Sequence, residues 1–116
     1  MLAICQEMIK LRELLTEHDI EWFDNSTIVS DKTVDKLVKL GHEKRYCDTT
    51  IYRTFFKFNG LEISVVNGYG TYGGYDPYTG SNKGLLEIWD GEHDIEGWLT
   101  AEQIISMLGI DNETNQ

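Results

Sequence analysis

The first seventeen residues show an apolar pattern with helical spacing. Ile4, Met8, Leu11 and Leu15 recur every three or four residues, and mostly polar residues separate them. This spacing places the four side chains on one face of a helix. We therefore expect an amphipathic helix from about Leu2 to Glu17 that buries this face in the core.

A second, shorter helix is expected after an extended segment over Ile20 to Phe23. Ser30 or Asp31 can accept hydrogen bonds from the free amides of its first turn, and Gly41 is a suitable stop. The helix has a narrow apolar side and many charges, so we expect it on the surface. Its apolar positions are Val34, Leu37 and Val38.

The clearest local signal is a β-hairpin around Asn59-Gly60, the pair that best tolerates the two positive φ angles of a type I′ turn. Strands are expected over Thr50 to Phe58 and Leu61 to Val66. A two-residue turn fixes the register. It pairs Phe58 with Leu61, Phe56 with Ile63 and Thr54 with Val65 on an apolar face, and sets Lys57 opposite Glu62 on the other face. The apolar face should meet the first helix.

The remaining pattern predicts a third strand over Leu85 to Trp89, a tight turn at Asp90-Gly91 and a further strand over His93 to Ile95. Thr100 and Gln103 have the spacing of a capping box before a last apolar helix, which Gly109 ends.

The order of these elements predicts an α+β fold: a single domain with an antiparallel β-meander, an N-terminal amphipathic helix and a short C-terminal helix. The chain has 116 residues, 41% of them apolar, which suits one domain over residues 1–110, with a frayed acidic tail over 111–116. No apolar run approaches the ~20 residues that a membrane span needs, and no leader pattern is present. We expect a cytoplasmic protein without membrane contact.

Charge is unevenly spread along the chain, whose formal net charge is -10. Residues 1–30 carry about -4, residues 31–57 about +3 and residues 58–116 about -9, and no Lys or Arg follows Lys83. Direct nucleic-acid binding is not expected, because it needs basic residues to neutralise phosphates. The strongly acidic segment 58–116 would instead attract a basic protein surface.

A glycine- and tyrosine-rich segment runs from Asn67 to Gly84. Residues Gly68 to Gly73 match the G-x-G-x-x-G pattern of dinucleotide-binding proteins, but Gly74 and Pro77 continue the loop where that chemistry needs a helix. No cofactor is therefore expected.

Four tyrosines recur at every third position of this loop: Tyr69, Tyr72, Tyr75 and Tyr78. Their rings either cap the edge of the core and keep the hydroxyls in water, or form an exposed recognition surface. The length of the loop favours a function for part of it.

An acidic run follows Trp89 and consists of Asp90, Glu92, Asp94 and Glu96. Alternate side chains of a strand point in opposite directions, so we expect a solvated acidic edge and no metal site. The chain shows no nucleophile paired with a base in a known motif, and we expect no catalytic residues and no enzyme.

Four segments of the second half resemble a group of short uncharacterised bacteriophage and prophage proteins. They are Phe58-Asn-Gly-Leu-Glu-Ile-Ser-Val-Val, Gly70-Thr-Tyr-Gly-Gly, Gly84-Leu-Leu-Glu-Ile and Gly97-Trp-Leu-Thr. The chain departs from the group by an extension over Tyr75 to Lys83 and an apparent insertion over Lys32 to Cys47. The resemblance implies a phage gene product in a bacterial cytosol and an anti-defence role, but no particular activity.

These observations favour a non-catalytic inhibitor that binds a host protein with a basic surface, such as an anti-CRISPR-like inhibitor of a nucleic-acid-binding nuclease. The alternatives are a binder that sequesters a nucleotide signal, with Lys83 and Arg53 supplying charge, and a self-associating accessory module. The predicted binding residues are Tyr69, Thr71, Tyr72, Tyr75, Tyr78, Lys83, Trp89, Asp90, Glu92, Asp94 and Glu96.

Overall fold

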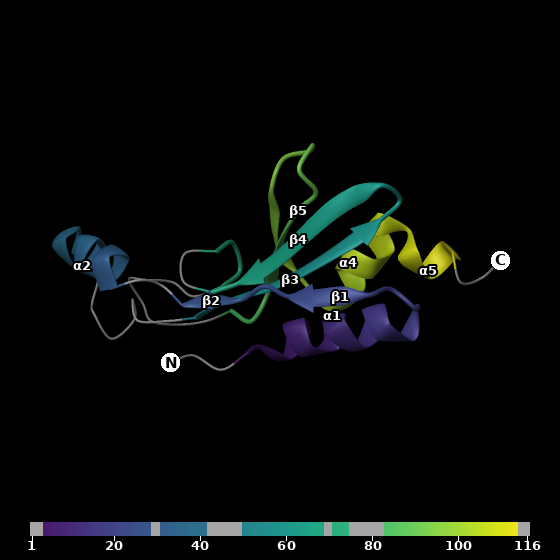
Figure 1. The fold of residues 1–116 in the computed structure, drawn as a ribbon, viewed down its shortest axis with the longest axis horizontal. Helices are drawn as coiled ribbons and strands as arrows, with labels where there is room; N and C mark the ends of the chain where they lie inside the picture. Colours follow the sequence, from purple (N-terminus) through teal and green to yellow (C-terminus); the bar gives the residue numbers. More distant parts are fainter. Residues whose placement is uncertain (1–3, 29–30, 42–49, 69–70, 75–82, 114–116) are drawn as a thin grey trace.

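A computed structural model of the chain describes residues 4–28, 31–41, 50–68, 71–74 and 83–113. Its elements are α1 (Gln6–Glu17), β1 (Trp22–Asp24), β2 (Thr27–Ile28), α2 (Asp31–Lys39), β3 (Thr50–Phe58), β4 (Leu61–Asn67), β5 (Leu86–Trp89), β6 (Glu96–Leu99), α4 (Ala101–Leu108) and α5 (Ile110–Glu113) (Figure 1). None of the helices in these ranges is both long and apolar enough to cross a membrane.

The sheet is antiparallel and has the strand order β1-β3-β4-β5-β6, while β2 pairs with β3 beyond the end of β1. Strands β3 to β6 follow one another both in sequence and in the sheet, so they form a meander. The expected α+β fold, with an N-terminal and a short C-terminal helix around this meander, is confirmed.

The predicted hairpin is present with the predicted register. Asn59 and Gly60 have φ angles of 51° and 77°, as a type I′ turn requires. The pairs Phe56 with Ile63, Thr54 with Val65 and Lys57 with Glu62 all form. The two-residue turn and the apolar alternation of both strands therefore agree on one register.

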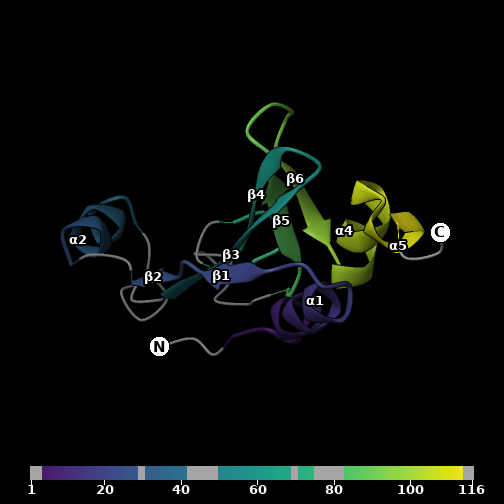
Figure 2. The ribbon, with the colours of Figure 1, turned by 45° about the vertical axis from the view of Figure 1, so that its right-hand side comes forward.

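Two helices cover one face of the sheet, which makes the core two layers thick (Figure 2). The apolar face of α1 and that of α4 meet the inward side chains of β3, β4 and β5, as expected for the first helix. Among the fully buried side chains of this core are Met8, Leu11, Leu15, Phe56, Ile63, Val65, Leu86 and Ile104.

Helix α1 begins at Gln6, four residues later than the apolar pattern predicts. Cys5 is its N-cap and has extended backbone angles. Ile4 still packs against the core from this extended backbone. Leu2 lies outside the described residues.

The predicted capping box of the last helix is confirmed. The Thr100 hydroxyl accepts from the Gln103 amide (3.2 Å), and the Gln103 side chain accepts from the Thr100 amide (2.8 Å). Glu7 of α1 adds a third acceptor, because its carboxylate accepts a hydrogen bond of 2.8 Å from the Ala101 amide. Gly109 ends the helix with a φ of 77°, and α5, which the sequence pattern did not predict, follows directly.

The last strand lies three residues later than predicted. The sequence indicated a tight turn at Asp90-Gly91 and a strand over His93 to Ile95, whereas β6 spans Glu96–Leu99. The Asp90 carboxylate accepts hydrogen bonds from the backbone amides of Glu92 and His93. These bonds hold the two residues in a loop that is wider than a tight turn. The strand prediction was wrong because it did not consider that the Asp90 carboxylate can accept hydrogen bonds from the backbone amides that follow it.

Helix α2 stands at one end of the long axis, apart from the sheet and α1 (Figures 1 and 2). The described backbone is elongated, with extents of 53 × 23 × 22 Å. Gly41 follows the helix with a φ of 100°, in agreement with its expected role as a stop.

Candidate recognition surface on the open face of the sheet

The sheet face opposite α1 and α4 carries a row of aromatic side chains. Phe23 pairs with Phe55, Phe55 with Ser64, and Ser64 with Trp89, so the row crosses four neighbouring strands. Their chain neighbours Trp22, Phe56, Ile63 and Ile88 face the core. Strand alternation thus places the row on the side opposite α1 and α4, which none of the described helices covers.

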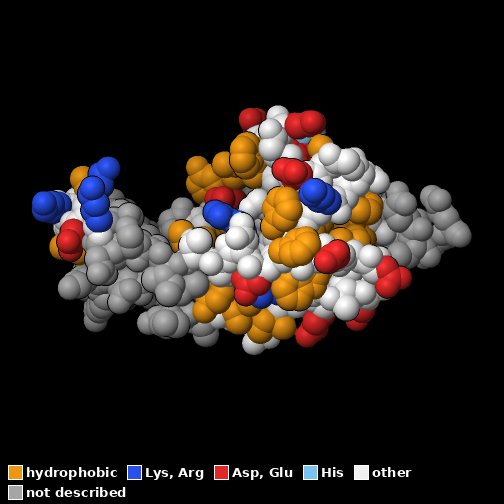
Figure 3. Space-filling view, viewed as in Figure 1, with side chains coloured by type: hydrophobic (Ala, Val, Ile, Leu, Met, Phe, Trp, Pro, Cys, Tyr) orange, Lys and Arg blue, Asp and Glu red, His pale blue; other side chains and the backbone are white. Residues whose placement is uncertain are grey.

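The two ends of the row are exposed to solvent. Phe23 is 52% and Trp89 49% exposed, and Phe55 between them is partly buried. The Trp89 indole donates a hydrogen bond of 3.0 Å to the His93 carbonyl, which fixes the ring against the β5–β6 loop. Figure 3 shows hydrophobic side chains gathered over β1 and the β3–β4 hairpin, with charged side chains beside them.

A hollow of about 430 Å³ lies at the Trp89 end of the row, between the β3–β4 turn and the β5–β6 loop. Phe55, Ser64 and Trp89 contribute its aromatic and polar wall. Carboxylates from both flanking segments line it as well: Glu62, Asp90 and Glu92. An aromatic wall with an acidic rim suits a cationic side chain, because both the ring faces and the carboxylates attract positive charge.

Lys57 moderates this acidity on one side. It lies directly opposite Glu62 in the β3–β4 ladder and is exposed. Opposite charges in such cross-strand positions attract. Lys57 therefore reduces the negative potential that Glu62 contributes at the hollow.

Asp90 organises the loop that forms the rim. Its Oδ1 accepts the Glu92 and His93 amides at 2.9 and 2.8 Å, and its Oδ2 contacts His93 Nδ1 at 2.6 Å. These hydrogen bonds, those from the two amides first, lower the pKa of Asp90 to about 2. The same carboxylate raises the pKa of His93, chiefly through the side-chain hydrogen bond.

The predicted acidic run is divided between two hollows. Asp94 and Glu96 line a second hollow of about 310 Å³ together with Leu61, Ile88, His93 and the end of α4, and Asp90 borders both. The run does not form one continuous edge, because residues 91–95 leave the strand path around Asp90.

The described part of the glycine- and tyrosine-rich loop is a tight turn packed on the sheet. The Thr71 hydroxyl donates to the Gly68 carbonyl (2.9 Å) and accepts from the Gly68 amide (3.0 Å). The Tyr72 amide donates to Glu87, and the Tyr72 carbonyl accepts from the Trp98 amide. Tyr72 itself is 56% exposed.

Two glycines of this turn make close protein contacts. A Cβ on Gly73 would come within 2.8 Å of the Leu85 Cβ, and one on Gly74 would overlap the Thr71 hydroxyl. Close packing within the protein therefore accounts for both glycines. Lys83 is exposed. Tyr69, Tyr75 and Tyr78 lie outside the described residues.

Sequence reasoning missed Phe23, Phe55, Glu62 and Ser64. The signal was present for Phe55, because the alternation that turns Phe56 inward turns Phe55 outward.

Sequence reasoning also missed Trp98, which is 57% exposed and has a φ of 61°, an unusual value for a bulky residue. Trp98 sits in the irregular β5–β6 pairing beside Tyr72.

Within the described part of the chain, no three His, Cys, Asp or Glu side chains gather as a metal site would require. Comparison with protein-family models, curated proteins and solved structures found no match to this chain. The fold and the open sheet face thus define its class, an α+β domain in which the described helices leave one aromatic sheet face open.

Proposed function

We propose that this chain is a non-catalytic binding protein whose open-face hollow receives a Lys or Arg side chain from a basic surface of another protein. One observation carries the proposal: the aromatic side chains of Phe55 and Trp89 and the carboxylates of Asp90 and Glu92 line the same hollow. Trp and Tyr are common anchors in protein interfaces, and hydrogen bonding already orders the Trp89 ring.

The energetics favour a cation over an apolar group at this position. A cation over an aromatic ring gains about 0.5–2 kcal/mol, and a hydrogen bond to a charged group contributes roughly 1.5–3 kcal/mol. The formal charge of -10 would further raise the association rate with a basic partner, and salt would reduce this effect.

The partner we propose is a nucleic-acid-handling protein of a bacterial host, such as a defence nuclease. An acidic chain that fills a basic groove competes with the nucleic acid that normally occupies it. The resemblance to bacteriophage proteins supports this setting, and an inhibitory role follows from the competition.

Binding of an octa-arginine peptide tests the hollow itself. We expect Glu62→Gln/Glu92→Gln to weaken binding about 5- to 20-fold in isothermal titration calorimetry at low salt, since two rim charges are lost. The matched control is Glu21→Gln/Glu102→Gln, two exposed carboxylates outside this hollow, which changes the net charge equally and should weaken binding less than about 2-fold. Equal weakening by both pairs would show that only net charge matters and would overturn the assigned site.

Phage plating tests the inhibitory role separately. Cells with a nuclease-based defence should allow plating of a sensitive phage when they express the wild-type chain or the control pair. The rim variant should restore protection. If the wild-type chain, stably expressed, fails to change plating across a panel of such defences, the proposed partner class is wrong even where the peptide binds.

A further inference from the structure

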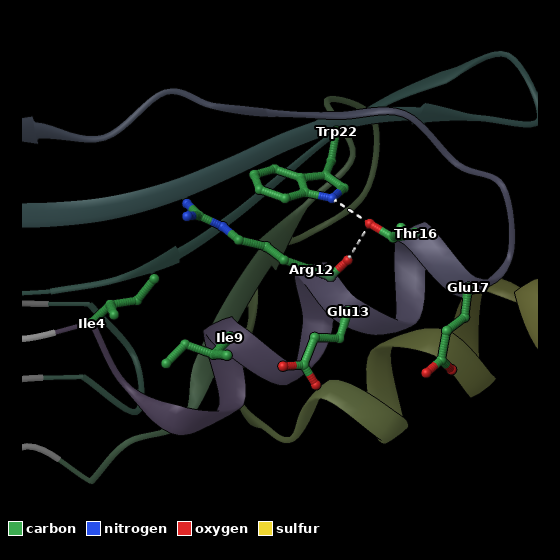
Figure 4. A pocket seen from close by; sticks show the side chains of 7 residues that line it. All are labelled: Ile4, Ile9, Arg12, Glu13, Thr16, Glu17 and Trp22. Atoms are coloured by element: carbon green, nitrogen blue, oxygen red, sulfur yellow. Dashed lines mark hydrogen bonds between the residues drawn. The ribbon is translucent and has the colours of Figure 1, made fainter.

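A separate hollow of about 510 Å³ lies between α1 and β1, on a side of the molecule that the proposed recognition surface does not use (Figure 4). Ile4, Ile9 and Trp22 give it an apolar lining. Glu13 and Glu17, one helical turn apart, project from α1 at its edge. The hollow is thus an apolar groove along a helix with an acidic border.

The walls of this groove are ordered by hydrogen bonds. The Trp22 indole donates to the Thr16 hydroxyl at 3.0 Å, and that hydroxyl donates to the Arg12 carbonyl at 3.0 Å. The Arg12 guanidinium lies 4.8 Å from the centre of the Trp22 ring. A preformed groove binds with a smaller entropic cost than one that must be assembled.

Helix α2 has the complementary character. Lys32, Lys36 and Lys39 are exposed, and helical geometry places them along one stripe. Val38 and Leu40, at the end of the helix, are 40% and 66% exposed. Large apolar side chains held in water at the end of a projecting helix favour association with another surface.

The spacing of the charges matches as well. Lys32 and Lys36 are four residues apart, as are Glu13 and Glu17. Two helices that lie side by side can therefore form two ion pairs, while the apolar end of one helix enters the groove of the other. Within a single chain α2 stands away from this groove (Figures 1 and 2), so a second copy is the occupant that the geometry allows.

We propose that two copies of this chain associate by exchange of α2, with the helix of each copy docked in the α1–β1 groove of the other. The arrangement is two-fold symmetric, so each contact forms twice and the assembly closes as a dimer. Light scattering after size exclusion should show a mass that increases toward that of a dimer between about 1 and 100 µM protein.

Charge reversal gives the sharpest test. Glu13→Lys/Glu17→Lys and Lys32→Glu/Lys36→Glu should each be monomeric, because each places like charges at both contacts. An equimolar mixture of the two variants should again form a dimer, because the α2 helix of each variant then docks in a groove of opposite charge on the other variant. The control Glu21→Lys/Glu62→Lys changes two acidic residues outside the groove and should leave the dimer intact.

A monomeric wild-type chain at all concentrations would overturn the proposal, as would a mixture that stays monomeric. Circular dichroism should show native helix content in every variant, so that loss of the dimer is not loss of the fold. Octa-arginine should bind the monomeric Lys32→Glu/Lys36→Glu variant at least as well as it binds the wild type, because the open-face hollow is untouched and the added carboxylates attract the peptide. This result separates a failure of the dimer from a failure of the proposed function.

Discussion

The guanidinium Nε of Arg12 donates a hydrogen bond of 2.7 Å to the hydroxyl of Thr54, a residue with no solvent exposure. The same guanidinium reaches the Arg53 carbonyl at 3.3 Å and the Asp24 carboxylate at 3.2 Å. One side chain of α1 is thereby joined to both β1 and β3. This charged group serves the packing of helix on sheet.

Arg12→Met should lower the free energy of unfolding by about 1–3 kcal/mol, measured by urea denaturation. Methionine keeps much of the apolar stem but removes every hydrogen bond of the guanidinium. The matched control is Lys10→Met, which removes an exposed ion pair with Glu102 and should lower the free energy of unfolding much less, because solvent screens such pairs. Similar losses in the two variants would contradict the role given to Arg12.

Gly97→Ala should destabilise the fold through a direct overlap. A Cβ at position 97 would meet the Cβ and backbone carbonyl of Tyr72, and an overlap of this kind costs about 1–3 kcal/mol. Gly60→Ala is a useful comparison, because nothing lies within 4 Å of a Cβ there. Its cost should be limited to the positive φ, about 1 kcal/mol. Thermal unfolding should rank Gly97→Ala as the less stable variant, and the opposite order would refute the packing of Tyr72 on Gly97.

His93 should titrate above its usual pKa in an NMR experiment, and Asp90→Asn should return its pKa toward the ordinary value of about 6.5. The control Asp94→Asn should shift it less, because Asp94 makes only a minor electrostatic contribution. An unchanged His93 pKa in Asp90→Asn would show that the two side chains do not interact in solution.

The same pair has a defined effect on stability. The folded pKa of His93 is raised, so its contribution is fully present below the ordinary histidine value and is lost as the pH rises through the raised one. The folded pKa of Asp90 is lowered to about 2, so its contribution is present above the ordinary aspartate value and is lost as the pH falls toward about 2. The pair therefore stabilises the loop most between these limits.

Lys57→Gln should strengthen binding of octa-arginine about 2- to 5-fold at low salt. Lys57 lies opposite Glu62, so its removal leaves that carboxylate free to attract the peptide. Lys36→Gln on the projecting helix changes the net charge equally and should have a smaller effect. A larger effect from Lys36 would place the peptide elsewhere on the molecule.

Local chemistry in the sequence was enough to predict much of this fold. The Asn59-Gly60 turn set the register of two strands, and Thr100 with Gln103 marked the start of the last helix. Both signals act between residues close in sequence, which is why they could be read without the structure. The start of β6 could not be read in this way, because the side chain of Asp90 redirects the backbone that follows it.

The candidate surfaces depend on contacts between distant segments. Alternation could indicate that Phe55 points outward, but only the sheet order places it in one row with Phe23 and Trp89. The groove beside α1 requires Trp22 to lie over Arg12, and no spacing rule contains that information. Tertiary packing, and not local propensity, creates both hollows.

The hydrogen bond from the Ala101 amide to Glu7 joins residues that are 94 positions apart. At synthesis rates of about 5–20 residues per second, roughly 5–20 s separate the appearance of the two partners at the ribosome. Throughout that interval α1 lacks the helix that covers part of its apolar face in the folded domain. The contact between α1 and α4 can therefore form only after the strands between them have been synthesised.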